Sequence, residues 1–383
     1  MKIAFDAKRA YQNATGLGHY SRSLISSLAT YYPENRYFLC APKLTSQYDI
    51  KNLKNVSNLV PTGFFSKRLK FLWRSNWVKR DLINEGMQLY HGLSHEIPVG
   101  IQKTGIRSVV TIHDLIFERS PEQYNKIDVQ IYRRKFMYAC NNADHIIAIS
   151  KQTKNDIIDF YKIPEEKISI CYQSCNPSFA ATISEEEKNR IRKLYDLPER
   201  FFLYVGAIIE RKNLLNVCKA IHTLKAKSSI PLVVIGKGGA YKKEVKEYVS
   251  RHHLESTVIF LSETNAAKAS FGFQSSLDFP AIYQLSQALI YPSFFEGFGI
   301  PILEALWSRT PVITSNSSCL PETGGNAAYY IDPYSVDEIA AAMLHITSDK
   351  DLAEEMKVKG WEHAQNFAAE KCAAQVMQVY LRL

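Results

Sequence analysis

The stretch "ALIYPSFFEGFGIPILEALWS" at residues 288–308 contains the pattern that decides the fold. Its first six residues are apolar and rich in strand formers, which is typical of a buried β-strand. Pro301 suits the first position of the helix predicted over "PILEALWS". Gly297 and Gly299 lie in the turn between them and permit close backbone approach and positive φ angles. A buried strand followed at once by a helix is the unit of a parallel α/β sheet.

The same unit recurs along the chain. Buried strands are predicted at "KIAF", "RYFLCA", "SVVTIH" and "HIIAIS" in the first half, and at "FFLYVGA", "PLVVIG", "TVIFL" and "TPVITS" in the second. Helix-length segments such as "GHYSRSLISSLATYY" and "LLNVCKAIHTLKAKS" separate them. The sequence therefore predicts an α/β fold with parallel sheets, in which ligands bind beyond the carboxyl ends of the strands.

The composition and the expected secondary structure change near residues 172–198, which predicts a domain boundary. A polar loop passes there into a charged helix, and a new buried strand, "FFLYVG", then begins. The length of 383 residues suits two domains with separate cores. We expect an N-terminal domain over 1–175 and a C-terminal domain over 176–365, facing each other across a cleft.

The composition limits the partners and the compartment. Lys and Arg number 47 against 38 Asp and Glu, an excess of nine positive charges that suits nucleotide phosphates, an acidic membrane or nucleic acid. No nucleic-acid motif or strongly basic tail is present, so nucleic acid is not expected. The seven cysteines have neither disulfide nor zinc spacing. With no signal peptide and no run of about 20 apolar residues, we expect a cytoplasmic protein, peripheral on the inner face of the membrane.

Two carboxylates flank the turn in the opening stretch. The free N–H groups at the start of the following helix can bind a phosphate or a sugar hydroxyl. Glu296 precedes this position and Glu304 follows it, and a carboxylate can accept two hydrogen bonds from a vicinal diol. Alternatively, Glu304 only complements the helix dipole and Glu296 is a solvated loop residue. The spacing alone leaves both interpretations open.

Basic residues follow the first strand of the second half. Arg211 and Lys212 in "YVGAIIERKNL" could neutralise a leaving diphosphate, or could form an ordinary exposed charged turn. The glycines of "VVIGKGGAYKKEV" are more typical of an ordinary turn.

The first half offers two further candidates. Gly16 and Gly18 precede an amphipathic helix without completing a dinucleotide fingerprint, and they permit close approach to a diphosphate or an acceptor. His113 ends the strand "SVVTIH" and is followed by Asp114. A lone histidine is more often structural, but a strand's carboxyl end favours a site residue.

Several motifs in order resemble the retaining glycosyltransferases of family 4, which have the GT-B fold of two Rossmann-like domains. They are "TGLGHYSRSL", "TIHDLIF", "YVGAIIERKN", "EGFGIPILEA" with its E-x7-E spacing, and "LPETGGNAAYYIDPYSVDEIAAAM". The His-Asp-Leu and Arg-Lys-Asn forms are most similar to mannosyltransferases of bacterial surface-polysaccharide synthesis. The resemblance also implies that the N-terminal domain, 1–175, is the acceptor side and that the C-terminal domain, 176–365, binds the nucleotide sugar. It further implies that a C-terminal helix, 366–383, packs back onto the N-terminal domain.

The resemblance implies roles around the E-x7-E turn. Glu296 would contact hydroxyls of the transferred sugar, and Glu304 would bind the ribose diol of the donor. The backbone amides of this turn would serve the sugar or its phosphate, namely those of Phe298, Gly299 and Ile300.

Roles for the other motifs follow in the same way. Arg211 and Lys212 would bind the diphosphate, and His113 would bind the donor sugar near the reacting carbon. Gly16 and Gly18 would leave room at the phosphate and the acceptor.

Two features depart from the family pattern. Many members carry Arg directly after the glycine of "VG", where this chain has Ala207, so the diphosphate would depend more on the two basic residues that follow. The stretch "SETNAAKASFGFQSSLDF" is longer than usual, so the residues of the nucleobase pocket cannot be assigned by the resemblance.

These features together predict a retaining transferase that moves mannose from GDP-mannose to a glycan or polyprenyl-linked acceptor. No DxD-like motif lies near the proposed site, so we expect no metal or other cofactor. Three alternatives remain: a UDP-sugar donor, a sugar-nucleotide epimerase, and a basic binding protein without catalysis.

The segment "FFSKRLKFLWRSNWVKR" at 64–80 is a candidate membrane contact. On one helix, Lys67, Lys70 and Arg74 would align and could dock on anionic lipid headgroups. A partly buried helix with a solvated basic strip fits the same pattern.

Overall fold

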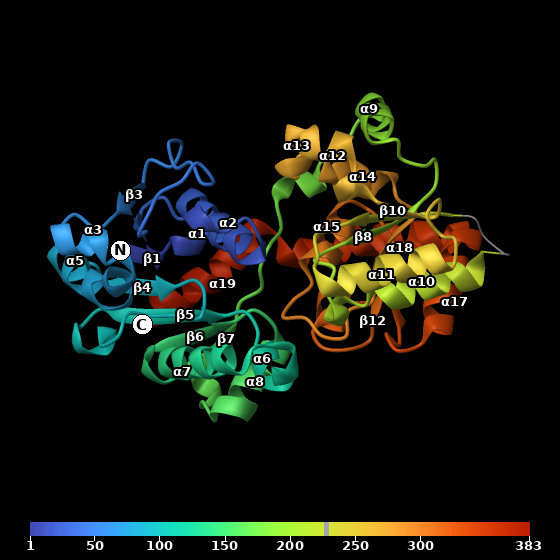
Figure 1. The fold of residues 1–383 in the computed structure, drawn as a ribbon. Coiled ribbons are helices and arrows are strands. Elements are labelled where there is room, and N and C mark those ends of the chain that lie inside the picture. The colour runs from blue at the N-terminus through green and yellow to red at the C-terminus, as the bar shows by residue number, and fades with distance from the viewer. Residues whose placement is uncertain (226–229) are drawn as a thin grey trace. The chain divides into compact units, whose positions relative to one another are not determined.

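The computed structural model describes residues 1–225 and 230–383. The chain forms two compact units, one made of Met1–Cys175 with Phe367–Leu383 and the other of Asn176–Asn366. In each unit helices pack against a sheet of parallel strands (Figure 1). The α/β fold predicted from the sequence is therefore confirmed.

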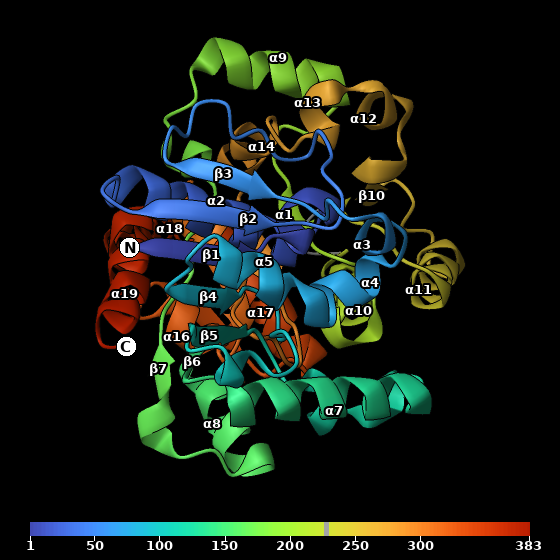
Figure 2. The ribbon, with the colours of Figure 1, turned by 90° about the vertical axis from the view of Figure 1, so that its left-hand side faces the viewer.

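The sheet of the first unit has the order β3-β2-β1-β4-β5-β6-β7 in the described residues, and Figure 2 shows these strands in sequence from top to bottom. Its apolar runs are buried on both faces, as a parallel sheet covered by helices requires. The strands are β1 (Lys2–Asp6), β2 (Arg36–Cys40), β3 (Val56–Leu59), β4 (Leu89–Gly92), β5 (Arg107–Ile112), β6 (His145–Ala148) and β7 (Ile168–Ile170).

The helices of the first unit surround this sheet. They are α1 (Lys8–Gln12), α2 (Gly16–Tyr31), α3 (Phe64–Arg68), α4 (Lys70–Leu72), α5 (Val78–Asn84), α6 (Ile116–Arg119), α7 (Lys126–Asn142), α8 (Lys151–Tyr161) and α19 (Ala369–Leu381). The C-terminal helix α19 packs against α2 (Figure 1). Its Tyr380 hydroxyl lies 2.5 Å from Nδ1 of the buried His91 on β4. Residues from the two ends of the chain thus share one core.

The segment 64–80 is not one continuous helix. Leu69, with φ −104° and ψ 55°, separates α3 from α4, and a π-helical turn, η1 (Trp73–Trp77), precedes α5. Arg74 is buried and forms ion pairs with Asp6 and Glu96. Arg74 can be buried because these two carboxylates pair with its guanidinium, and a buried charge without such a partner is strongly destabilising. The predicted alignment of Arg74 with Lys67 and Lys70 on one exposed face is therefore wrong.

The sheet of the second unit has the order β10-β9-β8-β11-β12-β13 in the described residues. All of its strands pair in parallel, so their carboxyl ends lie at one edge of the sheet. Helical segments connect one strand to the next along the chain. The strands are β8 (Phe202–Val205), β9 (Leu232–Ile235), β10 (Val258–Phe260), β11 (Ala288–Tyr291), β12 (Val312–Ser315) and β13 (Ala328–Ile331).

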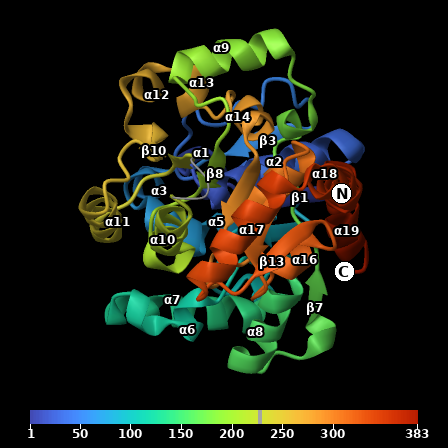
Figure 3. The same cartoon turned by 90° about the vertical axis from the view of Figure 1, so that its right-hand side faces the viewer.

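Helices cover this second sheet, and α17 lies between α10 and α18 (Figure 3). Ser184 and Ser335 cap α9 and α17 by accepting hydrogen bonds from Glu187 N and Glu338 N. The helices are α9 (Glu185–Tyr195), α10 (Leu214–Leu224), α11 (Ala240–Arg251), α12 (Asn265–Ala269), α13 (Phe271–Gln274), α14 (Phe279–Leu285), α15 (Ile300–Trp307), α16 (Leu320–Gly324), α17 (Val336–Ser348) and α18 (Lys350–Ala364). Among the helices of the described residues, none is both long and apolar enough to cross a membrane.

Candidate functional site

The turn between β11 and α15 places a carboxylate at the edge of the second sheet. Gly299 has φ 108°, a conformation that side chains with a Cβ rarely adopt, so this position requires glycine. A Cβ there would also lie 3.1 Å from Leu320 Cδ2. Pro301 follows at the helix start, as the sequence predicts. The chain therefore turns sharply after the strand and fixes Glu296 where parallel sheets bind ligands.

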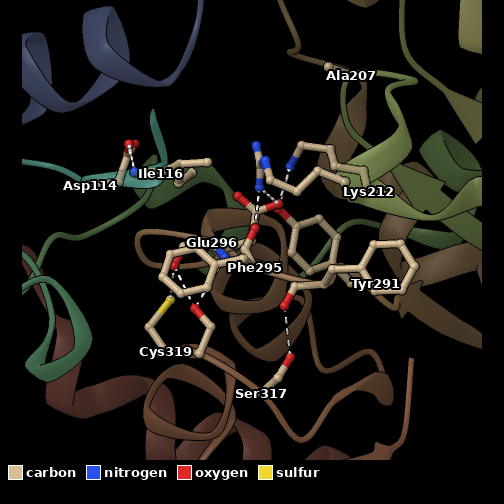
Figure 4. Close-up of polar contacts among 12 residues, drawn as sticks. Asp114, Ile116, Ala207, Lys212, Tyr291, Phe295, Glu296, Ser317 and Cys319 are labelled. Carbon is tan, nitrogen blue, oxygen red and sulfur yellow. Dashed lines mark hydrogen bonds and ion pairs between the residues drawn. The ribbon is translucent and has the colours of Figure 1, made fainter. Parts of the chain in front are cut away.

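Glu296 is buried and pairs with two cations, and Figure 4 shows its contact with Lys212. Its Oε1 lies 2.7 Å from Nζ of Lys212 and 2.9 Å from Nη1 of Arg211. Lys212 Nζ also donates to the hydroxyl of Tyr291, at 2.6 Å. The side chains of these two basic residues are only 12–13% exposed. The interpretations of a solvated Glu296 and of an exposed charged turn at 211–212 are therefore wrong.

The charges of this cluster determine its protonation. Burial acts to raise the pKa of Glu296, but the charges and hydrogen bonds of Lys212 and Arg211 outweigh it and hold the pKa at about 2. Burial lowers the pKa of Lys212, while the charge of Glu296 opposes that effect. With one anion and two cations, the cluster has one formal positive charge to offer an anionic ligand.

Polar contacts join the turn that carries Glu296 to the two neighbouring loops. Ser318 Oγ accepts from Glu296 N at 3.2 Å and donates to its carbonyl oxygen at 2.7 Å. Cys319 Sγ donates to the same oxygen at 3.0 Å. Phe294 N donates to Arg211 O at 2.9 Å. These backbone contacts fix the segments that carry Glu296 and Arg211, and Figure 4 shows the one from Cys319.

Asn213 positions the turn that carries the two cations. The turn is a 3₁₀ segment, Glu210–Lys212, and Asn213 ends it in the left-handed conformation with φ 60°. Its Nδ2 donates to the carbonyl oxygens of Pro292 at 3.1 Å and Pro333 at 2.7 Å. One side-chain amide thus joins the loops that follow β8, β11 and β13.

The glycine-rich loop after β9 lies beside the same turn. A Cβ on Gly236 would lie 1.9 Å from Gly206 O, and one on Gly238 would lie 2.3 Å from Ile208 O. These glycines therefore allow two loop backbones to pack closely. The nearby Ala207 is exposed.

Glu304 has a different environment from Glu296. It is the fifth residue of α15 and lies beyond the first turn, so it does not complement the helix dipole at the N-terminus. Its Oε2 accepts a hydrogen bond from the hydroxyl of Tyr283, at 2.7 Å. Burial raises the pKa of Glu304 to about 7, although the Tyr283 hydrogen bond acts in the opposite direction. This carboxyl can therefore change its charge near neutral pH.

His113 belongs to the first unit, where it follows β5 and is buried. Its Nε2 lies 2.9 Å from Leu93 O, which only accepts, so Nε2 carries the proton and Nδ1 is an acceptor. Burial lowers the pKa of His113 to about 4, so the ring is neutral at pH 7. His95, with φ 64°, lies beside it at a ring-centroid distance of 5.1 Å.

Gly16 and Gly18 also belong to the first unit, at the start of α2. A Cβ on Gly18 would lie 1.8 Å from Asn13 O, so local packing alone requires this glycine. A Cβ on Gly16 would meet no heavy atom within 4 Å.

The structure thus brings together some of the predicted residues within the second unit. Glu296, Arg211 and Lys212 are in direct contact. Phe298, Gly299, Ile300 and Glu304 belong to the same strand–turn–helix element. Sequence reasoning missed Ser318, Cys319 and Asn213, although the polar run "SNSSC" directly after a predicted strand was a usable signal.

Comparison with protein families gives two matches that follow one another along the chain. Residues 21–179 match the model described as Glycosyltransferase Family 4, and residues 185–363 match that of Glycosyl transferases group 1. O-antigen chain mannosyltransferase B of Escherichia coli is 27% identical over 395 residues, covering 99% of each chain. O-antigen chain mannosyltransferase RfbU of Salmonella typhimurium is 28% identical, covering 85% of each chain.

Solved structures show the same architecture. A glycosyltransferase from Rickettsia africae superposes with a TM-score of 0.75 at 16% identity, covering 100% of this chain and 98% of the other. Anabaena Alr3699/HepE in complex with UDP and glucose gives a TM-score of 0.75 at 16% identity, with 100% of each chain covered. The solved structures show that the chain has the GT-B fold, and the two family matches, which together span most of the chain, show that it belongs to the glycosyltransferases of family 4.

Proposed function

We propose that this glycosyltransferase moves mannose, with retention, from GDP-mannose to a glycan or polyprenyl-linked acceptor during the assembly of a cell-surface polysaccharide. The observation that carries the proposal is the buried cluster of Glu296, Arg211 and Lys212 at the carboxyl edge of the second sheet. The full-length similarity to an O-antigen mannosyltransferase supports mannose as the transferred sugar.

The two cations would stabilise the leaving group. As the bond between the anomeric carbon and the phosphate oxygen breaks, negative charge develops on the diphosphate. Arg211 and Lys212 are already held in place by Glu296, so little reorganisation is needed when that charge appears. Preorganised charge of this kind is usually the largest contribution to lowering such a barrier.

Glu296 would act on the sugar itself. Its Oε1 pairs with both cations, and the carboxylate would accept further hydrogen bonds from hydroxyls of the mannose. The negative charge would also stabilise the positive charge that develops at the anomeric carbon. The acceptor oxygen would form the new bond on the face that the diphosphate leaves, and a phosphate oxygen would take its proton.

Neither a metal ion nor another cofactor is part of this proposal. Arg211 and Lys212 supply the positive charge that a divalent ion provides in other transferases.

A panel of sugar nucleotides tests the donor. Bound donor stabilises the folded state by about 2.7 kcal/mol at a concentration of 100 Kd, so GDP-mannose should raise the melting temperature more than UDP-glucose or UDP-galactose. Release of GDP should then depend on an added acceptor. If only UDP-sugars stabilised the protein, GDP-mannose would be refuted as the donor and a UDP-sugar would be favoured. Conversion of the donor sugar without release of GDP would indicate an epimerase, and binding without turnover would indicate a binding protein.

We further propose that segment 64–72 contacts an anionic membrane beside a lipid-linked acceptor, on the cytoplasmic side. Phe64, Phe65 and Phe71 are 74%, 70% and 64% exposed, and Lys67 and Lys70 are exposed among them. Exposed aromatic and basic side chains in one short segment suit the interface of an anionic bilayer.

Helix α7 could enlarge this surface. Lys135 Nζ on α7 lies 5.8 Å from the centroid of the Phe71 ring, and Ile131 and Ile127, one and two turns before Lys135, are exposed. Co-sedimentation with vesicles containing phosphatidylglycerol tests the contact. Phe271, 78% exposed in the second unit, provides the matched control substitution to Ser.

A further inference from the structure

The strand order of each sheet reverses beside the strand that comes first in the chain. In the first unit β1 lies between β2 and β4, because the chain adds β2 and β3 on one side of it and β4 to β7 on the other (Figure 2). In the second unit the reversal lies between β8 and β11, the strands that precede the cluster of Arg211, Lys212 and Glu296. Ligands of open parallel sheets bind beyond the carboxyl ends of the two strands at such a reversal. The position beyond β1 and β4 is therefore a candidate binding site of the first unit itself.

Residues of the same kinds as in that cluster lie beyond β1 and β4. Lys8 and Arg9 follow β1, and Glu96 follows β4. Glu96 does not neutralise this basic pair, because both of its oxygens have other partners. Its Oε2 lies 2.8 Å from Arg74 Nη1, and its Oε1 lies 3.2 Å from Lys135 Nζ. The first unit thus has a basic pair without the carboxylate that neutralises the corresponding pair in the second unit.

Asp6, the last residue of β1, is also paired elsewhere. Both of its oxygens lie 3.0 Å from Nε of Arg74, and Oδ1 accepts from Lys8 N at 3.3 Å. The side chains of Lys8 and Arg9 form no ion pair or hydrogen bond with another residue of the ranges 1–225 and 230–383. The two carboxylates and their two basic partners balance in charge, so Lys8 and Arg9 leave this group with two unneutralised positive charges.

The surroundings of these two cations contain further positive charge and neutral rings. Lys8 and Arg9 are half-buried. Burial lowers the pKa of Lys8, and the charges of Arg74 and Arg9 lower it further, although the two carboxylates oppose them. Arg9 lies close enough to His95 and His113 for its charge to add to burial in lowering the pKa of both rings. A bound anion would relieve this repulsion, so the group favours a negatively charged ligand.

The partners of Glu96 connect this position to the proposed membrane contact. Lys135 Nζ, which pairs with Glu96, lies 5.8 Å from the centroid of the Phe71 ring. Arg74 comes just after the proposed membrane segment in the chain and pairs with both Asp6 and Glu96. The loop after β1 is therefore joined by these ion pairs to the exposed aromatic side chains that would enter a bilayer. A ligand with a lipid chain beside Phe71 and an anionic group beyond β1 fits both features.

We infer that Lys8 and Arg9 bind the phosphate group through which the acceptor glycan is attached to its lipid. Arg9 can offer two N–H donors side by side to phosphate oxygens, and Lys8 offers a compact positive charge. The inference rests on the proposed transfer to a lipid-linked acceptor. It gives that acceptor a binding site in the first unit, separate from the cations proposed to hold the donor.

Calorimetric titration of the full chain with geranyl diphosphate tests the inference, in saturating GDP so that Arg211 and Lys212 are occupied. Lys8→Ala and Arg9→Ala should each weaken binding about tenfold or more, because a charged hydrogen bond is lost, whereas Lys8→Arg should stay within about threefold. Lys103→Ala removes an exposed lysine that precedes β5, at the opposite edge of the same sheet, and should have no effect. Since the side chains of Lys8 and Arg9 bond to no other described residue, both alanine variants should melt like the wild type.

Two related probes distinguish the sources of the phosphate. Geraniol has the same lipid chain without phosphate, so any binding of geraniol should not depend on Lys8. Pyrophosphate lacks the lipid chain and should bind more weakly than geranyl diphosphate. Equal affinity for these two anions would assign the cations to a soluble phosphate compound and overturn the inference. Binding of geranyl diphosphate that both alanine variants leave unchanged would also overturn it, as would a wild type that does not bind this probe.

Calorimetry with GDP separates this site from the donor site. Lys8→Ala and Arg9→Ala should keep the GDP affinity of the wild type, and a parallel loss of GDP affinity would assign these cations to the donor and overturn the inference. Failure of the enzyme to use GDP-mannose would refute the proposed donor, while Lys8-dependent binding of geranyl diphosphate would still support the phosphate site.

Discussion

Replacing Glu296 by Gln should destabilise the second unit, because it leaves Lys212 and Arg211 buried opposite a neutral amide. Removing one partner of a buried ion pair costs about 3–5 kcal/mol. The three side chains keep 10–13% exposure, and the Tyr291 hydroxyl still accepts from Lys212, so the cost should lie at or slightly below the lower end of that range. We expect a loss of about 2–3 kcal/mol.

This loss should be visible as a lower melting temperature. For a folding unit of this size, 1 kcal/mol shifts the melting temperature by about 2–4 °C, so Glu296→Gln should lower it by roughly 5–10 °C. The chain has two units, and proteins with more than one domain commonly unfold in more than one transition. Hydrogen exchange in peptides from β11 and β12 therefore reports the stability of the relevant unit directly.

Two further variants isolate the charge effect. Glu304→Gln makes the same chemical change eight residues away, but at pH 6 Glu304 is largely protonated because its pKa is about 7, so little stability should be lost. Adding Lys212→Met to Glu296→Gln removes one of the stranded cations and should restore about 1 kcal/mol or more. Pyrophosphate should stabilise Glu296→Gln more than the wild type, since it replaces the missing anion. A Glu296→Gln protein that melts within 2 °C of the wild type, or strictly additive double-variant effects, would refute the reasoning.

Four other outcomes are expected. Lys212→Ala and Arg211→Ala should each lower kcat/KM by about 10²-fold through lost stabilisation of the leaving diphosphate, and wild-type kinetics in both would contradict that role. If Glu304 binds the ribose diol, as the family resemblance implies, donor affinity should rise about tenfold between pH 6 and pH 8, because Glu304 with a pKa of about 7 loses its proton there and accepts hydrogen bonds better; calorimetry should show a flat profile for Glu304→Gln. Excess EDTA should leave the rate unchanged, and a loss that magnesium restores would show that the diphosphate is held by a metal. Replacing Phe71 and Lys70 together by Ser should reduce binding to anionic vesicles at low salt, and unchanged sedimentation would place the membrane contact elsewhere.

The sequence predicts the strands whose burial is visible in the local pattern. Continuous apolar runs identify β5, β8, β11 and β12, and their alternation with helices gives the parallel sheets. The strand β4, "LYHG", is short and contains a histidine, so no local signal marks it as buried. His91 is buried there because Thr111 and Tyr380, the latter 289 residues away, satisfy its ring nitrogens. A local sequence pattern contains no information about hydrogen-bond partners that lie so far away in the chain.

The same limit applies to the candidate site. The ends of the predicted strands indicate that Lys212 and Glu296 lie at the same edge of a sheet. They do not indicate that these two side chains, 84 residues apart in the sequence, are in direct contact. Arg74 was predicted to be exposed because helical spacing takes no account of Asp6, which lies 68 residues away and pairs with it. Helical spacing also implies a single helix that continues through Leu69. In the structure the backbone of Leu69 has non-helical φ and ψ angles and interrupts the helix.

The ion pair between Glu296 and the two basic residues bears on turnover as well as on the chemical step. A nucleoside diphosphate that departs does not leave two bare cations behind, because the carboxylate of the same chain is already bonded to both. In the proposed mechanism the carboxylate of Glu296 would compete with the product nucleotide for the hydrogen-bond donors of Arg211 and Lys212, which would weaken retention of that nucleotide. If the two basic residues hold the diphosphate as proposed, inhibition by the accumulated nucleoside diphosphate should be milder than their charge alone would suggest.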